Sequence, residues 1–381
     1  MDPPTDRDET VQERVNLVHR EVIQLLILIA IAIGAFFVTR AVAANNRAMN
    51  LQDAEEWYAR GTREAAADQL DRAVESFRRS VIRNRNHRPY ALALARALAR
   101  NHQEDRAQAV LAALRESSPE DPQINLELAR LAAARQDVTE AVRFYHNALY
   151  APWPLDRSGE RRQVRLELIR FLLTHNQAGG AVSELLALTS DLPDDTQAHA
   201  EIAQLFADAG DYGHALDQFQ QALRRSPDDV AALAGAGTSA FNLGNYAMAR
   251  SYLRRVPGGV DGAGQARELA DLILSNDPLV ARIGSAERRR RIEDDLNYAA
   301  RRLTECPAHQ PSAAERASLQ SEVTAFQDQL KQYSAVEQDT IEAGVDLVER
   351  VANHVSVACG PATPLDRALA LMGRQHGGTA R

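Results

Sequence analysis

Apolar residues recur through the middle of this chain with the spacing of amphipathic helices, and one pattern of them repeats six times. An alanine marks the register of each repeat. Four of the five steps between these alanines are 34 residues and the other is 40, and a large apolar residue follows each alanine by four positions. The alanines are Ala73, Ala107, Ala141, Ala181, Ala215 and Ala249. A period held this closely predicts an array of helical hairpins.

Two further positions of the repeat indicate how each hairpin is built. Twelve residues before the alanine, five of the six repeats carry a residue small enough for two helices to cross in close contact. The corner between the helices is expected at residue types that mostly tolerate a left-handed backbone. These corners are Asp68, His102, Gln136, Asn176, Gly210 and Gly244. Because one hairpin cannot bury its own apolar stripe, we expect neighbouring hairpins to stack.

The repeat resembles the tetratricopeptide repeat (TPR) family. The family's pattern of Trp, small, small and aromatic residues is present as Trp57, Gly61, Ala73 and Phe77, and later repeats finish with a proline. Those prolines are Pro119, Pro193 and Pro227. The resemblance covers roughly residues 54–260 and implies an α-solenoid of about six hairpins, whose first helices line a concave groove that binds a peptide or a partner protein.

An unbroken apolar stretch precedes the array. Residues 22–38 are apolar except for Gln24, and seventeen helical residues span roughly 25 Å. We therefore predict a single transmembrane helix at 22–39, after a flexible charged tail at 1–21 and before a juxtamembrane stalk at 40–53. Continuation of the helix through the stalk is the alternative to a separate segment. A cleavable signal peptide is the alternative, because Ala41 and Ala43 form an A-x-A site, although the region before it is long and acidic.

The charges beside this stretch favour one orientation. Arg7, Arg14 and Arg20 precede it, whereas Arg40 and Arg47 follow it closely. The positive-inside rule then places the N-terminus in the cytoplasm and, in a bacterial inner membrane, the rest of the chain in the periplasm. The opposite orientation, with the array on the cytoplasmic side, is the alternative.

A different pattern begins after the array. We expect a capping helix near residues 264–275, so that the array with its cap occupies 54–276. Asp277 followed by Pro278 predicts the start of a new helix. Three amphipathic patterns and a short last helix then predict a small helical bundle over 278–381. With the array and the single membrane helix, the predicted fold class is all-α.

Composition narrows the possible chemistry. The net charge of −8 argues against nucleic-acid binding. We find no catalytic or phosphate-binding motif, and predict a protein that is not an enzyme and has no cofactor, no metal and no small-molecule substrate. The two cysteines, Cys306 and Cys359, follow predicted helices and favour a disulfide in an oxidising compartment. Zinc binding with His309 and His354, or two unlinked thiols, are the alternatives.

Three arginines occupy one groove position in consecutive repeats. Arg96, Arg130 and Arg170 could accept an acidic peptide. Alternatively, Glu127 and Glu167, three residues before two of them, already pair with them on the same helix.

Other residues suggest apolar recognition. At the positions where the family's carboxylate clamp has Lys and Asn, this chain has Leu92, Leu126 and Leu166, which predict an apolar groove floor. Trp153, between two prolines in the six-residue insertion, either packs over a neighbouring repeat or forms an exposed partner anchor. The arginine run at 288–291 predicts a solvated, salt-bridged face, or else a docking site for anionic lipid or an acidic partner.

The functional hypothesis is a membrane-anchored scaffold that binds a peptide or partner protein for bacterial envelope assembly, secretion or periplasmic chaperoning. One alternative is a structural subunit of a membrane complex that docks through its C-terminal helices. A weaker alternative is an envelope regulator or enzyme with its activity in the C-terminal region.

Overall fold

The computed structural model describes residues 6–190, 192, 195–258, 262–305, 313–332, 336–359 and 362–377. Every regular element in these ranges is a helix, which confirms the all-α fold class. The chain divides into two compact units, Met1–Arg165 and Leu166–Arg381, and the division falls inside the helix α7. Each unit is described by itself.

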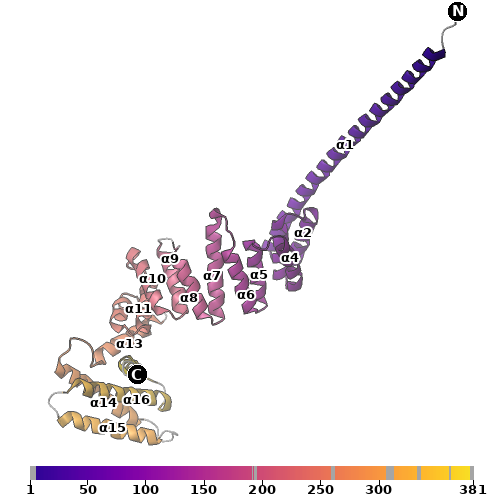
Figure 1. Cartoon of the computed structure of the whole chain (residues 1–381). Coiled ribbons are helices and arrows are strands. Elements are labelled where there is room, and N and C mark those ends of the chain that lie inside the picture. Colours follow the sequence, from indigo (N-terminus) through magenta and orange to yellow (C-terminus); the bar gives the residue numbers. More distant parts are fainter. Residues whose placement is uncertain are drawn as a thin grey trace, which may run out of the picture. The chain divides into compact units, whose positions relative to one another are not determined.

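The first unit holds three helical hairpins (Figure 1). They are α1 (Asp6–Ala66) with α2 (Leu70–Arg83), α3 (Arg88–Arg100) with α4 (Glu104–Ser117), and α5 (Pro122–Ala134) with α6 (Val138–Tyr150). A short 3₁₀ helix, η1 (Leu155–Arg157), lies in the six-residue insertion and leads into α7 (Ser158–Thr174). The two helices of each hairpin pack on each other, and α3 also packs against α5.

One helix, α1, includes several segments that the sequence pattern distinguishes. It runs from Asp6 to Ala66 as one unbroken α-helix (Figure 1) and so includes the apolar stretch, the stalk and the first helix of the first repeat. The sequence predicts a flexible tail at 1–21, whereas the chain is helical from Asp6. After Pro4 no proline follows before Pro89, and Gly34 and Gly61 are the only glycines in this helix. Nothing in this sequence therefore breaks the helix.

The second unit continues the repeats. Three further hairpins pair α7 with α8 (Ala178–Thr189), α9 (Thr196–Asp208) with α10 (Tyr212–Arg225), and α11 (Val230–Asn242) with α12 (Tyr246–Leu253). The predicted capping helix is present as α13 (Ala263–Asn276), which packs against α11 and α12. The prediction of about six hairpins is therefore confirmed.

Small residues allow the helices of a hairpin to cross closely. All six register alanines have an exposed fraction of 0%. A Cβ added at Gly61 would lie 2.8 Å from the Phe77 ring, and one added at Gly237 would lie 2.5 Å from Leu253 Cδ2. In both repeats the glycine therefore makes room for the large residue that follows the alanine by four positions.

The corners of the hairpins have the backbone conformation expected of them. Asp68, His102, Gln136 and Asn176 have φ between 54° and 61°, and Gly210 and Gly244 have φ of 79° and 75°. One residue after three of these corners, a side chain caps the next helix. In each cap the side-chain oxygen accepts a hydrogen bond from a backbone N–H: Asp137 from Glu140, Asp211 from His214 and Asn245 from Met248.

Four helices follow the array in the second unit. They are α14 (Ser285–Glu305), α15 (Ala313–Gln332), α16 (Gln338–Ala358) and α17 (Pro364–Gly377). Figure 1 shows α14, α15 and α16 side by side, and each packs against the other two. The last helix, α17, packs on both α16 and α13, and so joins the bundle to the end of the array. The new helix predicted at Asp277 begins instead at Ser285, because Asp277 ends α13 as its C-cap.

Candidate functional site

The apolar stretch of α1 is uncovered by the rest of the described chain. Its most apolar window has a mean hydropathy of 2.7, and none of that window is buried. Leu28, for example, is 63% exposed and Phe37 62%. A core helix of a soluble protein would be mostly buried, and this one is not. Because the helix is also long and apolar enough, it is a candidate membrane span. A signal sequence has the same properties.

The same helix enters the first hairpin without a loop. Ala54 is fully buried, and Arg83 on α2 donates to Asn50 Oδ1 at 3.2 Å and lies 3.7 Å from Asp53 Oδ2. Ser76 on α2 donates to Glu64 at 2.6 Å. These contacts attach α2 along the part of α1 that follows the apolar stretch.

The three arginines of the predicted groove are all paired. In the first unit Glu127, which is 7% exposed, accepts from Arg96 Nε at 2.7 Å and from Arg130 Nη1 at 3.0 Å. In the second unit Arg170 donates to Glu201 at 2.5 Å. We call these five residues the first-helix ladder, because all of them lie on the first helices of hairpins.

Two ion pairs of the ladder share a residue spacing that was not predicted from the sequence. Arg96 and Glu127, like Arg170 and Glu201, are 31 residues apart, which joins one register position of a repeat to another position of the next repeat. The expected pair on one helix occurs for Arg130 with Glu127. Arg170, however, pairs with Glu201 from the following hairpin. The signal was available in the sequence as a glutamate fourteen residues before the register alanine in consecutive repeats.

The leucines that were predicted to form an apolar groove floor are buried. Leu92, Leu126 and Leu166 have exposed fractions of at most 7%. Side chains with so little accessible area fill the packing between helices and offer a ligand almost no surface. The leucines therefore serve the core, and we do not assign them to a binding site.

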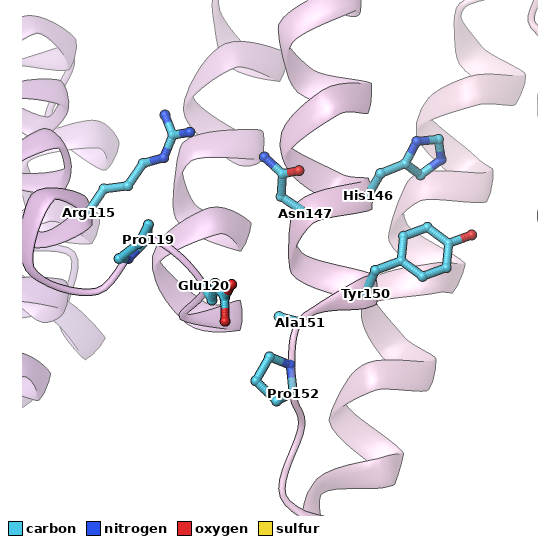
Figure 2. A pocket seen from close by; sticks show the side chains of 8 residues that line it. All are labelled: Arg115, Pro119, Glu120, His146, Asn147, Tyr150, Ala151 and Pro152. Atoms are coloured by element: carbon cyan, nitrogen blue, oxygen red, sulfur yellow. The ribbon is translucent and has the colours of Figure 1, made fainter.

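The six-residue insertion forms part of a cavity of about 450 Å³, which we call the α4–α6 cavity (Figure 2). The end of α4 and the following connection supply one side, and the end of α6 with the first insertion residues supplies the other. The lining residues are Arg115, Pro119, Glu120, His146, Asn147, Tyr150, Ala151 and Pro152.

Trp153 holds the insertion against its own repeat. Its indole Nε1 donates to the Ala148 carbonyl at 2.7 Å, and the residue is half-buried. Of the two hypotheses for this tryptophan, the structure therefore favours packing. The exposed apolar residues of the insertion are instead Tyr150 and Leu155.

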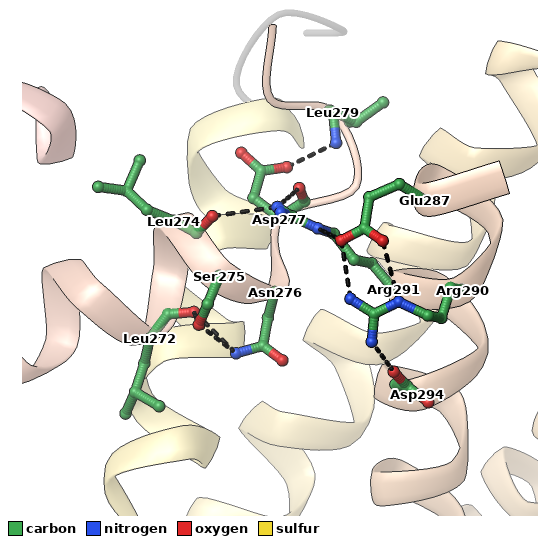
Figure 3. A network of polar contacts seen from close by, with 10 residues as sticks. All are labelled: Leu272, Leu274, Ser275, Asn276, Asp277, Leu279, Glu287, Arg290, Arg291 and Asp294. Carbon is green, nitrogen blue, oxygen red and sulfur yellow. Dashed lines mark hydrogen bonds and ion pairs between the residues drawn. The ribbon is translucent and has the colours of Figure 1, made fainter. Parts of the chain in front are cut away.

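A polar network joins α13 to α14 (Figure 3). Arg291 donates to the main-chain oxygens of Leu274 and Asp277 at 3.0 and 2.9 Å, and Asp277 Oδ1 accepts from Leu279 N at 2.8 Å. Glu287 accepts from Arg290 and Arg291. Those two hydrogen bonds lower the pKa of Glu287 to about 2.

The arginine run is thus largely a salt-bridged face. Arg290 also pairs with Asp294, and Arg289 pairs with Glu293. We therefore assign no docking role to this run.

Two titratable groups beside this network have displaced pKa values. Burial, with the nearby carboxylates of Asp294 and Asp277, raises the pKa of Asp295 to about 8 against the opposing effect of Arg291. His376, on α17, lies 3.1 Å from Asp277 Oδ2, and this hydrogen bond raises the pKa of the imidazole.

The predicted disulfide lies partly outside the described residues. Cys359 is the C-cap of α16, whereas Cys306 and His309 are not described, so the bridge stays a prediction. Within the described ranges, no group of three or more His, Cys, Asp or Glu side chains could hold a metal ion.

Comparison with known proteins gives one family. The sequence model of the tetratricopeptide repeat family matches residues 92–157 and 200–264. No curated protein matches the chain.

Several solved structures are similar to parts of the chain. YrrB, described as a TPR protein with an unusual peptide-binding site, is 20% identical with a TM-score of 0.37, and the alignment covers 48% of this chain and 91% of YrrB. PilF of Pseudomonas aeruginosa is 13% identical with a TM-score of 0.39, covering 54% and 91%. PilW, a type IV pilus biogenesis factor, is 18% identical with a TM-score of 0.38, covering 53% and 91%. With scores this low, these likenesses carry no conclusion about function.

The matched segments fall on the hairpins whose alanine register, corners and close crossings are described above. On that evidence the chain contains tetratricopeptide repeats, and proteins with such repeats generally mediate protein–protein interaction.

Proposed function

We propose that this protein is a single-pass, membrane-anchored adaptor, in which α1 crosses the bilayer and the array binds a peptide or partner protein. The observation that carries the proposal is the uncovered apolar stretch of α1, none of whose most apolar window is buried. Leaving such a surface in water is costly at roughly 25 cal/mol per Å², and a hydrocarbon environment removes that cost.

The continuity of α1 sets the distance between membrane and array. The fourteen stalk residues 40–53 are helical, and at 1.5 Å per residue they span about 21 Å. Because no loop interrupts them, the first hairpin is held off the bilayer surface by a helix. We infer that this spacing lets the adaptor reach partners that stand outside the headgroup region.

Within each unit, the ladder residues of that unit form the surface that we propose for partner binding. Arg96 and Arg170 keep 46% and 53% of their side chains exposed although each is paired. An arginine has five N–H donors, and a single ion pair uses only part of them. Since each pair also carries one opposite charge, the ladder favours a partner with mixed polar groups over a strongly acidic one.

The proposed location is a bacterial inner membrane with the array in the periplasm, on the balance of arginines around the span. In that compartment the partners belong to envelope assembly, secretion or periplasmic chaperoning. The cytoplasmic orientation is the alternative, and it would give the same adaptor a different set of partners.

The anchor is tested by placing charge in the apolar stretch. The double variant Ile27→Arg with Ile31→Arg should move the protein from the carbonate-resistant membrane fraction to the soluble fraction, because each arginine opposes insertion by about 2.5 to 3.5 kcal/mol. Ile82→Arg, on an exposed position of α2, is the control and should leave the protein in the membrane. Retention of the double variant in the membrane would contradict the proposal.

The partner surface is tested by crosslinking in cells. A photo-crosslinking residue at position 170 on the ladder should give discrete adducts. The same residue at position 224, exposed on the second helix α10, should give few. Equal adducts at both positions would mean that the ladder is not the binding surface.

A further inference from the structure

The α4–α6 cavity lies at the one place where the 34-residue period is broken. Its volume of about 450 Å³ falls in the range of about 300 to 1,000 Å³ that is typical of ligand sites. The insertion supplies Ala151 and Pro152 to its wall, and the hydrogen bond from Trp153 holds that wall in place. The insertion therefore builds a surface that an ordinary repeat lacks.

Several polar side chains of this cavity can reach a ligand. Arg115 stacks on the Phe144 ring, with its guanidinium carbon 5.2 Å from the ring centroid, and forms no hydrogen bond or ion pair with another described residue. The side chains of Glu120 and Asn147 are exposed, so their polar atoms are accessible to a ligand. Figure 2 shows Arg115 on one side and Asn147 on the other.

These groups match the main chain of a peptide. Arg115 and the Asn147 amide can donate, while Glu120 and the Asn147 carbonyl can accept. A peptide main chain presents both donors and acceptors, one of each per residue. Since Arg115 and Glu120 carry opposite charges, the lining favours neither an anion nor a cation.

The rim offers an apolar contact beside these polar groups. Tyr150, which lines the cavity, is 68% exposed. Pro119 and Pro152 add apolar surface with little conformational freedom to lose. Aromatic residues on rigid surfaces commonly anchor protein interfaces.

We propose that the α4–α6 cavity binds an extended peptide segment of a partner protein, with its main chain against Arg115, Glu120 and Asn147 and one apolar side chain against Tyr150. This site is separate from the first-helix ladder, since its residues come from second helices and connections. The adaptor therefore has two surfaces for partners, and the proposal stands whether or not the ladder binds one.

The test uses the full chain in detergent micelles and fluorescein-labelled heptapeptide pools, blocked at both ends, with a fixed central residue and mixed flanking positions. Fluorescence polarisation should show that the Leu and Phe pools bind at least threefold more tightly than the Asp and Lys pools. Arg115→Ala and Tyr150→Ala should each weaken the binding of the Leu pool at least fivefold.

The controls are an arginine with the same ring contact and an exposed apolar residue on another helix. Arg143 also stacks on Phe144, at 4.3 Å, but does not line the cavity, so Arg143→Ala should leave binding unchanged. Ile82→Ala should also have no effect. Unchanged helical circular dichroism would show that each variant is folded.

Three results would overturn the proposal. They are no binding of any pool, tighter binding of the Asp or Lys pool, and equal binding by the cavity variants and the controls. Loss of binding in Arg96→Ala alone would assign the peptide to the ladder, which contradicts this inference and leaves the proposed function intact. Self-association that Tyr150→Ala abolishes would show that a second copy of the chain covers the cavity.

Discussion

Individual residues decide how closely the helices of this array can pack. The register alanines are fully buried, and in two repeats a glycine lies directly against the large side chain of the second helix. Such contacts follow from residue size, which is why the alanine period and the small positions could be recognised in the sequence. The burial of Leu92, Leu126 and Leu166 could not be recognised there, because burial depends on which face of a helix the neighbouring helices cover.

Enlarging Gly237 should separate α11 from α12. A Cβ there would lie 2.5 Å from Leu253 Cδ2, so Gly237→Val should destabilise the second unit by about 2 kcal/mol. Gly213→Ala is the matched control, because its Cβ would meet only Asp211 Oδ1 at 3.6 Å. Thermal unfolding followed by circular dichroism should show a lower Tm for the first variant only. Equal Tm values would contradict the close crossing.

The raised pKa of Asp295 predicts that the second unit loses stability as the pH rises. Between about pH 4 and 8 the folded state keeps a proton on Asp295 that the unfolded chain has lost, so the free energy of unfolding falls across that window. His376 has the same sign, since the stability from its raised pKa is complete below about pH 6.5 and is lost as the pH passes the folded value.

Asp295→Asn isolates the first of these contributions. The variant cannot ionise, so at pH 9 it should be more stable than the natural chain, by on the order of 5 kcal/mol, and close to it at pH 4. Urea unfolding at both pH values measures the difference. Parallel pH profiles for the two proteins would mean that Asp295 titrates near its ordinary pKa.

At the scale of elements, the sequence predicted what is local and missed what is long-range. The hairpin corners depend on one residue each, and all six have the expected positive φ. The start of α14 was misplaced because Asp277 followed by Pro278 looks like a helix start. Its side chain is instead held by Leu279 and His376, the second of which lies almost a hundred residues away. The cross-repeat pairs of the ladder were missed for the same reason.

A buried ion pair fastens α14 to α17. Asp366 is 2% exposed and accepts from Arg302 Nε and Nη2 at 3.2 and 3.1 Å. Arg302→Ala would leave this carboxylate without its cation and should cost about 3 kcal/mol of stability. Arg301→Ala, a change at an exposed neighbour, should cost little. Chemical denaturation of both variants tests this, and equal costs would contradict the importance of the pair.

At the scale of the whole molecule, one continuous helix links an uncovered apolar stretch to the array of tetratricopeptide repeats. The sequence showed both parts, since each has its own hydrophobic period. It left open whether they share a helix, because the junction at residues 40–53 has neither pattern, and the structure shows that they do. The α4–α6 cavity also could not be predicted from the sequence, because it forms only where the end of α4 lies beside the end of α6.

The central claim is that α1 anchors the array to a membrane and exposes it on the periplasmic face. Protease treatment of intact spheroplasts, with an antibody against residues 54–260 and a second against a tag at the N-terminus, tests it most directly. We predict that the array signal disappears while a small tagged fragment stays protected in the membrane. Survival of the full-length chain until lysis would contradict the orientation, and release of the intact chain by carbonate would contradict the anchor itself.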